Sequence, residues 1–370
     1  MHAMTEVRIK RAKVSAGPEE EKAVLEVLRS GRYVKGPNVK AFEAEFAEFI
    51  GTKYAITVNS GTAALIVAML AAGIKHGDEV ITTPHTFMAT GNSILLAGGK
   101  PVFVDIDPEN FNINPDKIED AITPKTKAIL PVHLYGQSAD MDPIIDIAND
   151  KKLSVIEDAA QAHGAKYKGD NCGSFGNINC FSFYPTKNMT VCGDGGMITT
   201  DDKELYERSI MYRDAGRKAG DIEHTFVAGY NFRLSEMLAA VGRIQLKKLP
   251  KWNEERRQIA QWYERELSGI KQIILPEEME YAHHIYHLYS IRAQRRDDLL
   301  KFLEQNGVEA GTHYPIPMHV QETFKNLNYT RGNFPEAEKA AAEQVSLPIY
   351  PGLKENDVKY VAEQIKKFYK

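Results

Sequence analysis

The feature that most constrains this 370-residue chain is a regular alternation of short apolar runs with helix-like stretches. Each run is almost continuously apolar, which is typical of strands that are covered on both faces. Parallel strands need long crossover connections, usually helices. The alternation therefore predicts an α/β fold with a mostly parallel sheet. The predicted strands are 54–58, 78–82, 101–105, 127–132, 153–158, 179–184 and 197–200.

The second part of the chain has a different pattern. Long amphipathic helices are predicted over 235–249 and 252–267, with a break at Pro250, because proline inside a helix removes a hydrogen bond and clashes with the preceding turn. We therefore place a domain boundary near residue 252. The predicted division is a large domain over 14–252, a smaller α+β domain over 253–370, and an N-terminal segment, 1–13, packed at the domain or subunit interface. The smaller domain is predicted to contain a strand (287–292), a helix (295–306), a proline-rich loop (313–319) and two further helices.

Composition excludes several classes of partner. Lysine and arginine number 46 against 50 aspartates and glutamates, a net charge of −4, so no overall positive field draws the chain to nucleic acid or anionic lipid. The longest apolar stretch, Ala63 to Ile74, is well short of the ~20 residues that span a bilayer. The first ten residues lack the apolar core of a secretory signal. We expect a cytoplasmic protein with small-molecule substrates, and neither a nucleic-acid nor a membrane partner.

Two common kinds of site find no support in the sequence. Neither G-x-G-x-x-G nor G-x-x-x-x-G-K-[ST] occurs, which disfavours nicotinamide and ordinary ATP chemistry. His283, His284 and His287 resemble a metal cluster but lack the H-E-x-x-H register, so we expect structural or surface roles and no metal. The three cysteines lack C-x-x-C spacing and are expected to be reduced and structural.

Two short segments follow predicted strands and carry groups that bind ligands. Ser60, Gly61 and Thr62 stand where a strand meets a helix, so their free N–H groups and hydroxyls make either a phosphate site or an ordinary helix cap. Glu157 and Asp158 end an apolar strand, which is where open α/β sheets place their ligands. A helix cap is again the simpler alternative.

The third segment contains Lys187, which lies in the run FSFYPTKN ahead of the glycine-rich GDGG. In an apolar context the pKa of a lysine falls and its amine becomes nucleophilic, whereas a solvated turn lysine would be inert. Considered together, the three segments fit one chemistry. Pyridoxal phosphate needs a lysine for a Schiff base, an anion beside its pyridine nitrogen and a cradle for its phosphate. Lys187, Asp158 and the turn at residues 60–62 supply these groups.

With these residues in view, the chain resembles the DegT/DnrJ/StrS family of pyridoxal-phosphate-dependent sugar aminotransferases. The resemblance extends from GRYVKGP (31–37) to YPIPMHVQ (314–321). It implies the type I aminotransferase fold, with a mostly parallel seven-stranded sheet in the large domain and a smaller C-terminal domain. It also implies a homodimer with active sites at the interface. The motifs that carry it are NSGTAAL, PHTFMAT, IEDAAQAHGA, FSFYPTKN, GDGG and GYNFRLSEM.

The resemblance assigns roles to individual residues around the cofactor ring. Lys187 is similar to the Schiff-base lysine, and Asp158 to the partner of the pyridine nitrogen. Gln161 matches the residue that contacts the phenolic oxygen, and Phe87 the aromatic residue that stacks on the ring.

Phosphate contacts are implied in the same way. Gly61, Thr62 and Ser182 match the phosphate-binding positions, next to Ser60 in the turn. Asn231 matches the asparagine that reaches the phosphate of the neighbouring subunit, which predicts shared active sites in the homodimer.

The implied reaction transfers the amino group of L-glutamate to a nucleotide-linked keto-sugar, with a 3-keto acceptor slightly favoured over a 4-keto one. Deoxysugar dehydratases of this fold carry histidine in place of the lysine, so Lys187 favours transamination. Two alternatives stay open: a sugar dehydratase or oxidase on the same scaffold, and a catalytically silent regulatory protein.

Substrate contacts are predicted from the proline-rich loop and from local cations. Tyr314 and His319 lie in a stiff Y-P-x-P-x-H segment, which composition alone would describe as a turn between helices. Similar segments in the family close over the nucleotide-linked sugar. Because a diphosphate needs positive charge, Arg32, Lys35 and Arg233 are the candidate cations.

Overall fold

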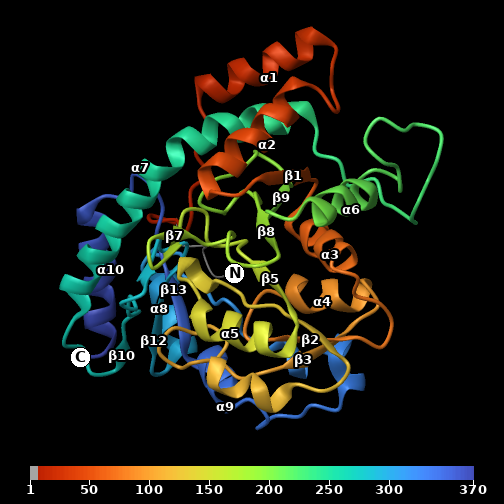
Figure 1. Ribbon diagram of the computed structural model, residues 1–370. Coiled ribbons are helices and arrows are strands. Elements are labelled where there is room, and N and C mark those ends of the chain that lie inside the picture. Colours follow the sequence, from red (N-terminus) through yellow and green to blue (C-terminus); the bar gives the residue numbers. More distant parts are fainter. Residues whose placement is uncertain (1–6) are drawn as a thin grey trace.

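The computed structural model describes residues 7–370, and its centre is a seven-stranded sheet of order β1-β9-β8-β5-β4-β2-β3 (Figure 1). All seven predicted strands are confirmed. β9 runs antiparallel to both of its neighbours, while the remaining pairs are parallel. The strands are β1 (Tyr54–Val58), β2 (Glu79–Thr82), β3 (Lys100–Phe103), β4 (Thr126–Ile129), β5 (Ser154–Asp158), β8 (Ile178–Ser182) and β9 (Gly196–Thr200).

Helices cover both faces of this sheet, because successive strand residues point to opposite sides. In β5, Ile156 belongs to a core shared with α3 and α4, whereas Val155 belongs to a core shared with α5. Residues of α2 and of the first half of α7 (Glu236–Leu267) form a further core with β8, which includes Phe181. The bounds of the helices are α1 (Pro18–Ser30), α2 (Pro37–Ile50), α3 (Gly61–Ala71), α4 (Ala89–Leu96), α5 (Met141–Lys151) and α6 (Lys203–Arg213).

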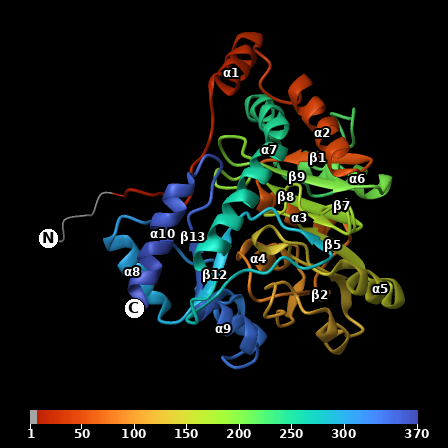
Figure 2. The same ribbon diagram turned by 90° about the vertical axis from the view of Figure 1, so that its left-hand side faces the viewer.

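The predicted break at Pro250 is wrong, because α7 is one continuous helix from Glu236 to Leu267. Pro250 lies on the exposed side of the helix, whereas Leu246 and Leu249 are buried. Packing on the buried side holds the helix together across the missing N–H, and water can solvate the carbonyl freed on the outer side. Figure 2 shows α7 running from α1 and α2 to α10.

The C-terminal part of the chain has a core of its own. A three-stranded sheet, β10-β12-β13, packs with α8, α10 and the second half of α7, and Ile9 from the N-terminal segment is buried in the same core. The division at residue 252 stays a prediction, and that boundary would fall inside α7. Residues 1–6 of the N-terminal segment lie outside the described residues. The elements are β10 (Ile273–Ile274), β12 (Tyr289–Ala293), α8 (Arg296–Gln305), α9 (Pro335–Glu343), β13 (Gln344–Leu347) and α10 (Glu355–Phe368).

A third small sheet joins the two parts of the chain. It consists of β6 (Lys166–Tyr167), β7 (Asp170–Asn171) and β11 (Ala282–His283). Within residues 7–370, no helix combines the length and the apolar character that crossing a membrane requires.

Candidate active site

The turn between β1 and α3 forms one wall of the site. The Ser60 hydroxyl caps α3 by accepting a hydrogen bond from the Ala63 N–H at 3.0 Å. A Cβ added to Gly61 would lie 2.6 Å from the Ser182 Cβ, so only glycine allows this turn to approach the end of β8. The fold thus brings together residues 60–62 and Ser182, which the sequence predicted to bind phosphate. The first N–H groups of α3 lie there beside hydroxyl groups.

Asp158 ends β5 and is almost completely buried, with 5% of its surface exposed. One carboxylate oxygen accepts a hydrogen bond from the Thr90 hydroxyl at 2.8 Å, and the other from the Ala160 N–H at 3.2 Å. Burial raises the pKa of Asp158, while these hydrogen bonds and the positive charge of Lys187 oppose that rise. The Thr90 contact escaped the sequence reasoning, because nothing in the spacing of the two residues signals it.

The neighbouring carboxylate, Glu157, has a structural role. It is fully buried and bonds the His133 ring at 2.7 Å. It also accepts hydrogen bonds from the N–H groups of Gly173, Phe175 and Gly176 at 2.6 to 2.7 Å, which anchors the loop ahead of β8. Adjacent strand residues point to opposite faces, so one carboxylate serves the loop and the other serves the site.

Lys187 lies in the loop that follows β8, and its amine makes no ion pair with any of residues 7–370. Burial lowers the pKa of Lys187 to about 8, although the Asp158 carboxylate pulls in the opposite direction. An amine with this pKa is neutral for a substantial part of the time near pH 8. An amine in its neutral form can act as a nucleophile or as a base.

Three further side chains, Gln161, Phe87 and Tyr314, form one connected group. Gln161 accepts a hydrogen bond from the Tyr135 N–H at 2.8 Å and donates one to the Tyr314 hydroxyl at 3.3 Å. The Phe87 ring is 48% exposed and its centroid lies 5.7 Å from that of Tyr314. Gln161, Phe87 and Tyr314 come from distant segments, and the fold brings them together.

Two histidines of the C-terminal part also approach Lys187, and sequence reasoning did not select either for the site. Burial, followed by the charge of Lys187 and other cations, lowers the pKa of His287. Burial likewise lowers the pKa of His313 to about 4, with Arg11 and Lys187 adding to the effect. Both rings are therefore neutral near pH 7. The sequence signal for His287 is its place in the predicted strand 287–292, where side chains are often buried.

The structure corrects the placement of His319. Its ring is 1% exposed, bonds Glu338 at 3.0 Å and packs against Phe334. The turn after Pro317 directs the side chain into this apolar cluster, so His319 cannot touch a substrate in this structure. We therefore no longer include His319 among the residues proposed to contact the substrate. Tyr314 stays among them.

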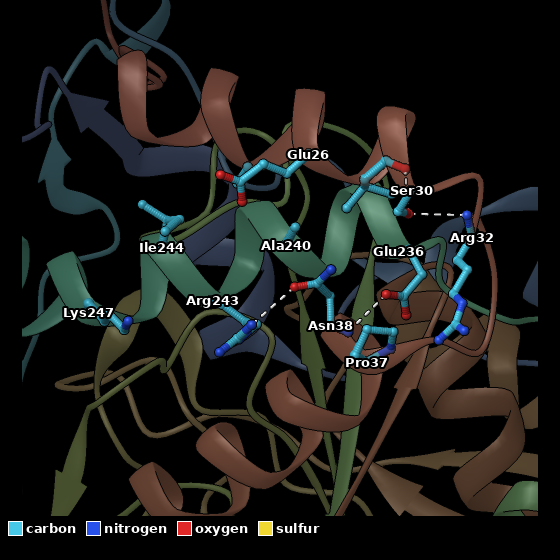
Figure 3. A pocket seen from close by; sticks show the side chains of 12 residues that line it. Glu26, Ser30, Arg32, Pro37, Asn38, Glu236, Ala240, Arg243, Ile244 and Lys247 are labelled. Atoms are coloured by element: carbon cyan, nitrogen blue, oxygen red, sulfur yellow. Dashed lines mark hydrogen bonds between the residues drawn. The ribbon is translucent and has the colours of Figure 1, made fainter.

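The three predicted cations do not form one cluster. Lys35 and Arg233 both bind the Asp214 carboxylate at the edge of a cavity of about 600 Å³. Burial alone would raise the pKa of Asp214, but these two partners outweigh it and lower the pKa to about 2. Arg32 instead lines a different pocket of about 440 Å³ between α1 and α7 (Figure 3). Asn231 is exposed on the loop that leads to Arg233.

The residues present fit pyridoxal phosphate. A glycine-dependent turn with free N–H groups, a buried carboxylate, an amine of lowered pKa and an exposed aromatic ring lie in one region. This donor set is the one that the cofactor's phosphate, pyridine nitrogen, aldehyde and ring require. Among residues 7–370 there is no cluster of three or more His, Cys, Asp or Glu side chains that could hold a metal ion.

Fold and site together define an aminotransferase that depends on pyridoxal phosphate. The chain belongs to the DegT/DnrJ/EryC1/StrS aminotransferase family, whose sequence model matches residues 14–366.

Curated relatives and a solved structure match nearly the whole chain. The chain is 48% identical to a "Pleiotropic regulatory protein" of Geobacillus stearothermophilus, over 95% of each chain. It is 41% identical to the dTDP-3-amino-3,4,6-trideoxy-alpha-D-glucose transaminase of Streptomyces venezuelae, over 95% of this chain and 92% of the relative. The crystal structure of S. venezuelae DesV in complex with a ketimine intermediate matches with a TM-score of 0.92 at 40% identity, over 95% and 94% of the two chains.

Proposed function

We propose that this protein transfers the amino group of L-glutamate to the keto carbon of a nucleotide-linked sugar. The observation that carries the proposal is a Lys187 amine of lowered pKa together with the buried Asp158 carboxylate, next to the turn at residues 60–62. The sugar is inferred from the S. venezuelae transaminase, whose name specifies a dTDP-linked amino sugar.

When bound, pyridoxal phosphate supplies an electron sink and carries the amino group between the two substrates. Ser60, Gly61, Thr62 and Ser182 would hold its phosphate through N–H groups and hydroxyls. Gln161 would contact its phenolic oxygen and Phe87 would cover its ring. Asn231 of a second copy of the chain would complete the phosphate site in a homodimer.

The two charged residues divide the proton chemistry between them. The Lys187 amine, neutral above about pH 8, would take a proton from the substrate Cα and deliver it to the cofactor's aldehyde carbon, C4′. The ionised Asp158 carboxylate would keep a proton on the pyridine nitrogen, because an opposite charge at short range favours the charged form of both partners. Burial of Asp158 strengthens this attraction by excluding water.

The acceptor is inferred to be a 3-keto rather than a 4-keto sugar. Support comes from the S. venezuelae relative, whose name places the amino group at carbon 3. Tyr314, held by Gln161 beside Phe87, is the side chain that we expect to contact the sugar.

A panel assay tests the proposal. Purified protein is incubated with L-glutamate, pyridoxal phosphate and UDP- or dTDP-linked 3-keto and 4-keto hexoses, and amino sugars are detected by mass spectrometry. Formation of 2-oxoglutarate with an amino sugar is expected. Turnover of free keto acids without any nucleotide sugar would make the protein a metabolic amino-acid aminotransferase.

The regulatory alternative has support in the name of the G. stearothermophilus relative. A silent binding protein would not need a lysine of lowered pKa beside a buried carboxylate. If the protein keeps its yellow cofactor band when glutamate is added, the regulatory alternative is correct. Bleaching of the band by glutamate supports the enzyme.

A further inference from the structure

We propose that Thr90 is a positioning residue that orients the Asp158 carboxylate and holds it in its ionised form. Thr90 is fully buried in the first turn of α4, and its hydroxyl donates to the Asp158 carboxylate at 2.8 Å. The inference rests on the role proposed above for Asp158. It extends the site to a helix that the sequence motifs did not connect with that carboxylate.

The direction of the Thr90–Asp158 hydrogen bond follows from which of the two groups carries a hydrogen. A threonine hydroxyl has one hydrogen, and an ionised carboxylate can only accept. Thr90 therefore donates to Asp158 and accepts from the Thr86 hydroxyl, which lies 3.3 Å away and is also buried. The two threonines form a short chain that points one donor at the carboxylate.

Contacts from the far end of the chain fix the position of Thr90. The next residue, Gly91, packs so closely that an added Cβ would lie 2.7 Å from the Phe324 ring and 3.0 Å from the Met318 sulfur. The Met318 N–H also donates to the Pro84 carbonyl at 2.8 Å, just before α4. The segment that follows Tyr314 thus clamps the start of α4, and with it the Thr90 hydroxyl.

A hydrogen bond to the charged form of a carboxyl lowers its pKa, so Thr90 opposes the effect of burial on Asp158. The other titratable groups that face Asp158 are Lys187, His133, Cys180 and Tyr314. Lys187 and His133 act in the same direction as Thr90. None of the four donates a hydrogen bond to the carboxylate, so the loss of Thr90 leaves one oxygen without a partner among residues 7–370.

The test measures cofactor binding by the apoprotein rather than turnover. Affinity for pyridoxal phosphate is titrated from pH 5 to 8.5 in the native protein and in Thr90→Val, Thr90→Ser and Asp158→Asn. Affinity should fall as Asp158 gains its proton, and Asp158→Asn should remove that inflection. Thr90→Val should move the inflection about one pH unit or more upward, which is the effect expected for one lost hydrogen bond to a charged group.

Controls separate positioning from packing. Thr90→Ser keeps the hydroxyl and should restore the native inflection. Ser93→Ala removes another buried hydroxyl from the same helix, one that bonds the Thr90 carbonyl at 2.9 Å and not Asp158, and should leave the inflection unchanged. If Thr90→Val does not fold, Thr90→Ala removes the hydroxyl without a branched replacement and gives the same readout.

Each outcome decides one of the two claims. A native inflection in a folded Thr90→Val or Thr90→Ala protein, together with its loss in Asp158→Asn, would overturn the inference about Thr90. An Asp158→Asn protein with the native pH profile would overturn the role proposed for Asp158 itself.

Discussion

Burial acts on the two charged residues of the site in opposite directions. It lowers the pKa of Lys187 to about 8 and raises the pKa of Asp158, so in both cases it favours the neutral form. The attraction between the two groups opposes both shifts. The result is an amine that loses its proton about two pH units below an ordinary lysine, whose pKa is about 10.4.

This shift predicts how Lys187 reacts with amine reagents. In the apoprotein, acylation of Lys187 should reach half its maximal rate near pH 8, because the neutral amine forms as pH rises through that value, whereas exposed lysines need a higher pH. Peptide mapping at several pH values measures it. In the holoprotein, borohydride should trap the cofactor on Lys187 alone, and trapping on another lysine would contradict the assignment of the site.

Asp158→Asn should fold normally yet lose most activity, because a neutral amide cannot keep the pyridine nitrogen protonated. One pKa unit is about 1.4 kcal/mol, so a shift of several units corresponds to a loss of about 10²-fold or more. Steady-state kinetics with glutamate measures this. Glu157→Gln is the contrasting variant, since it should act mainly on stability by weakening the loop at residues 173–176. Near-native turnover of Asp158→Asn would refute the electron-sink role.

Among the elements, α4 is held closely by residues distant in sequence. Gly91 has no space for a side chain, because Phe324 and Met318 are fully buried against it. The clamp makes the local geometry of the site depend on the segment that carries Tyr314. A small residue at this position is therefore a requirement of packing rather than of helix propensity.

Gly91→Ala should lower the free energy of unfolding by about 1 to 3 kcal/mol, the usual cost of overpacking a buried contact. Urea unfolding measures the change. The double variant Gly91→Ala with Phe324→Leu provides the control, because a smaller side chain at 324 relieves the clash and its effect should be less than additive. Equal stability of Gly91→Ala and the native protein would show that α4 is not clamped.

At the scale of the whole molecule, several aromatic side chains are exposed. Phe87, Tyr184, Phe226 and Tyr230 each expose more than two fifths of their surface. Tyr230 directly precedes Asn231, so one of these exposed rings lies beside the residue that would serve the second copy in the proposed homodimer.

Mixing two inactive variants tests the shared sites. If Asn231 serves the neighbouring subunit, a dimer of one Lys187→Ala chain and one Asn231→Ala chain contains one fully native site. After subunit exchange at limiting cofactor, activity should recover to about a quarter of the native level, because about half of the dimers are mixed and each has one native site of two. No recovery, or a fully active monomer in light scattering, would contradict the proposal.

The sequence alone determined the order of strands along the chain and named Lys187 and Asp158 as candidate cofactor residues. Buried parallel strands are short and almost continuously apolar, so β1 to β5, β8 and β9 could be recognised from local composition. A lysine, a carboxylate and a helix-start turn are also the groups that pyridoxal phosphate requires, so they could be named from the sequence before their burial was known.

Only the tertiary structure decided the features that depend on contacts between distant residues. Pro250 does not break α7 because it faces solvent while its neighbours pack inward. His319 turns into an apolar cluster, and Lys35 and Arg233 are both engaged by Asp214. Thr90 reaches Asp158 across 68 positions of the chain. Packing between distant segments decides which side of a helix a proline faces. It also decides which group a histidine or a carboxylate bonds, and local sequence patterns do not encode such contacts.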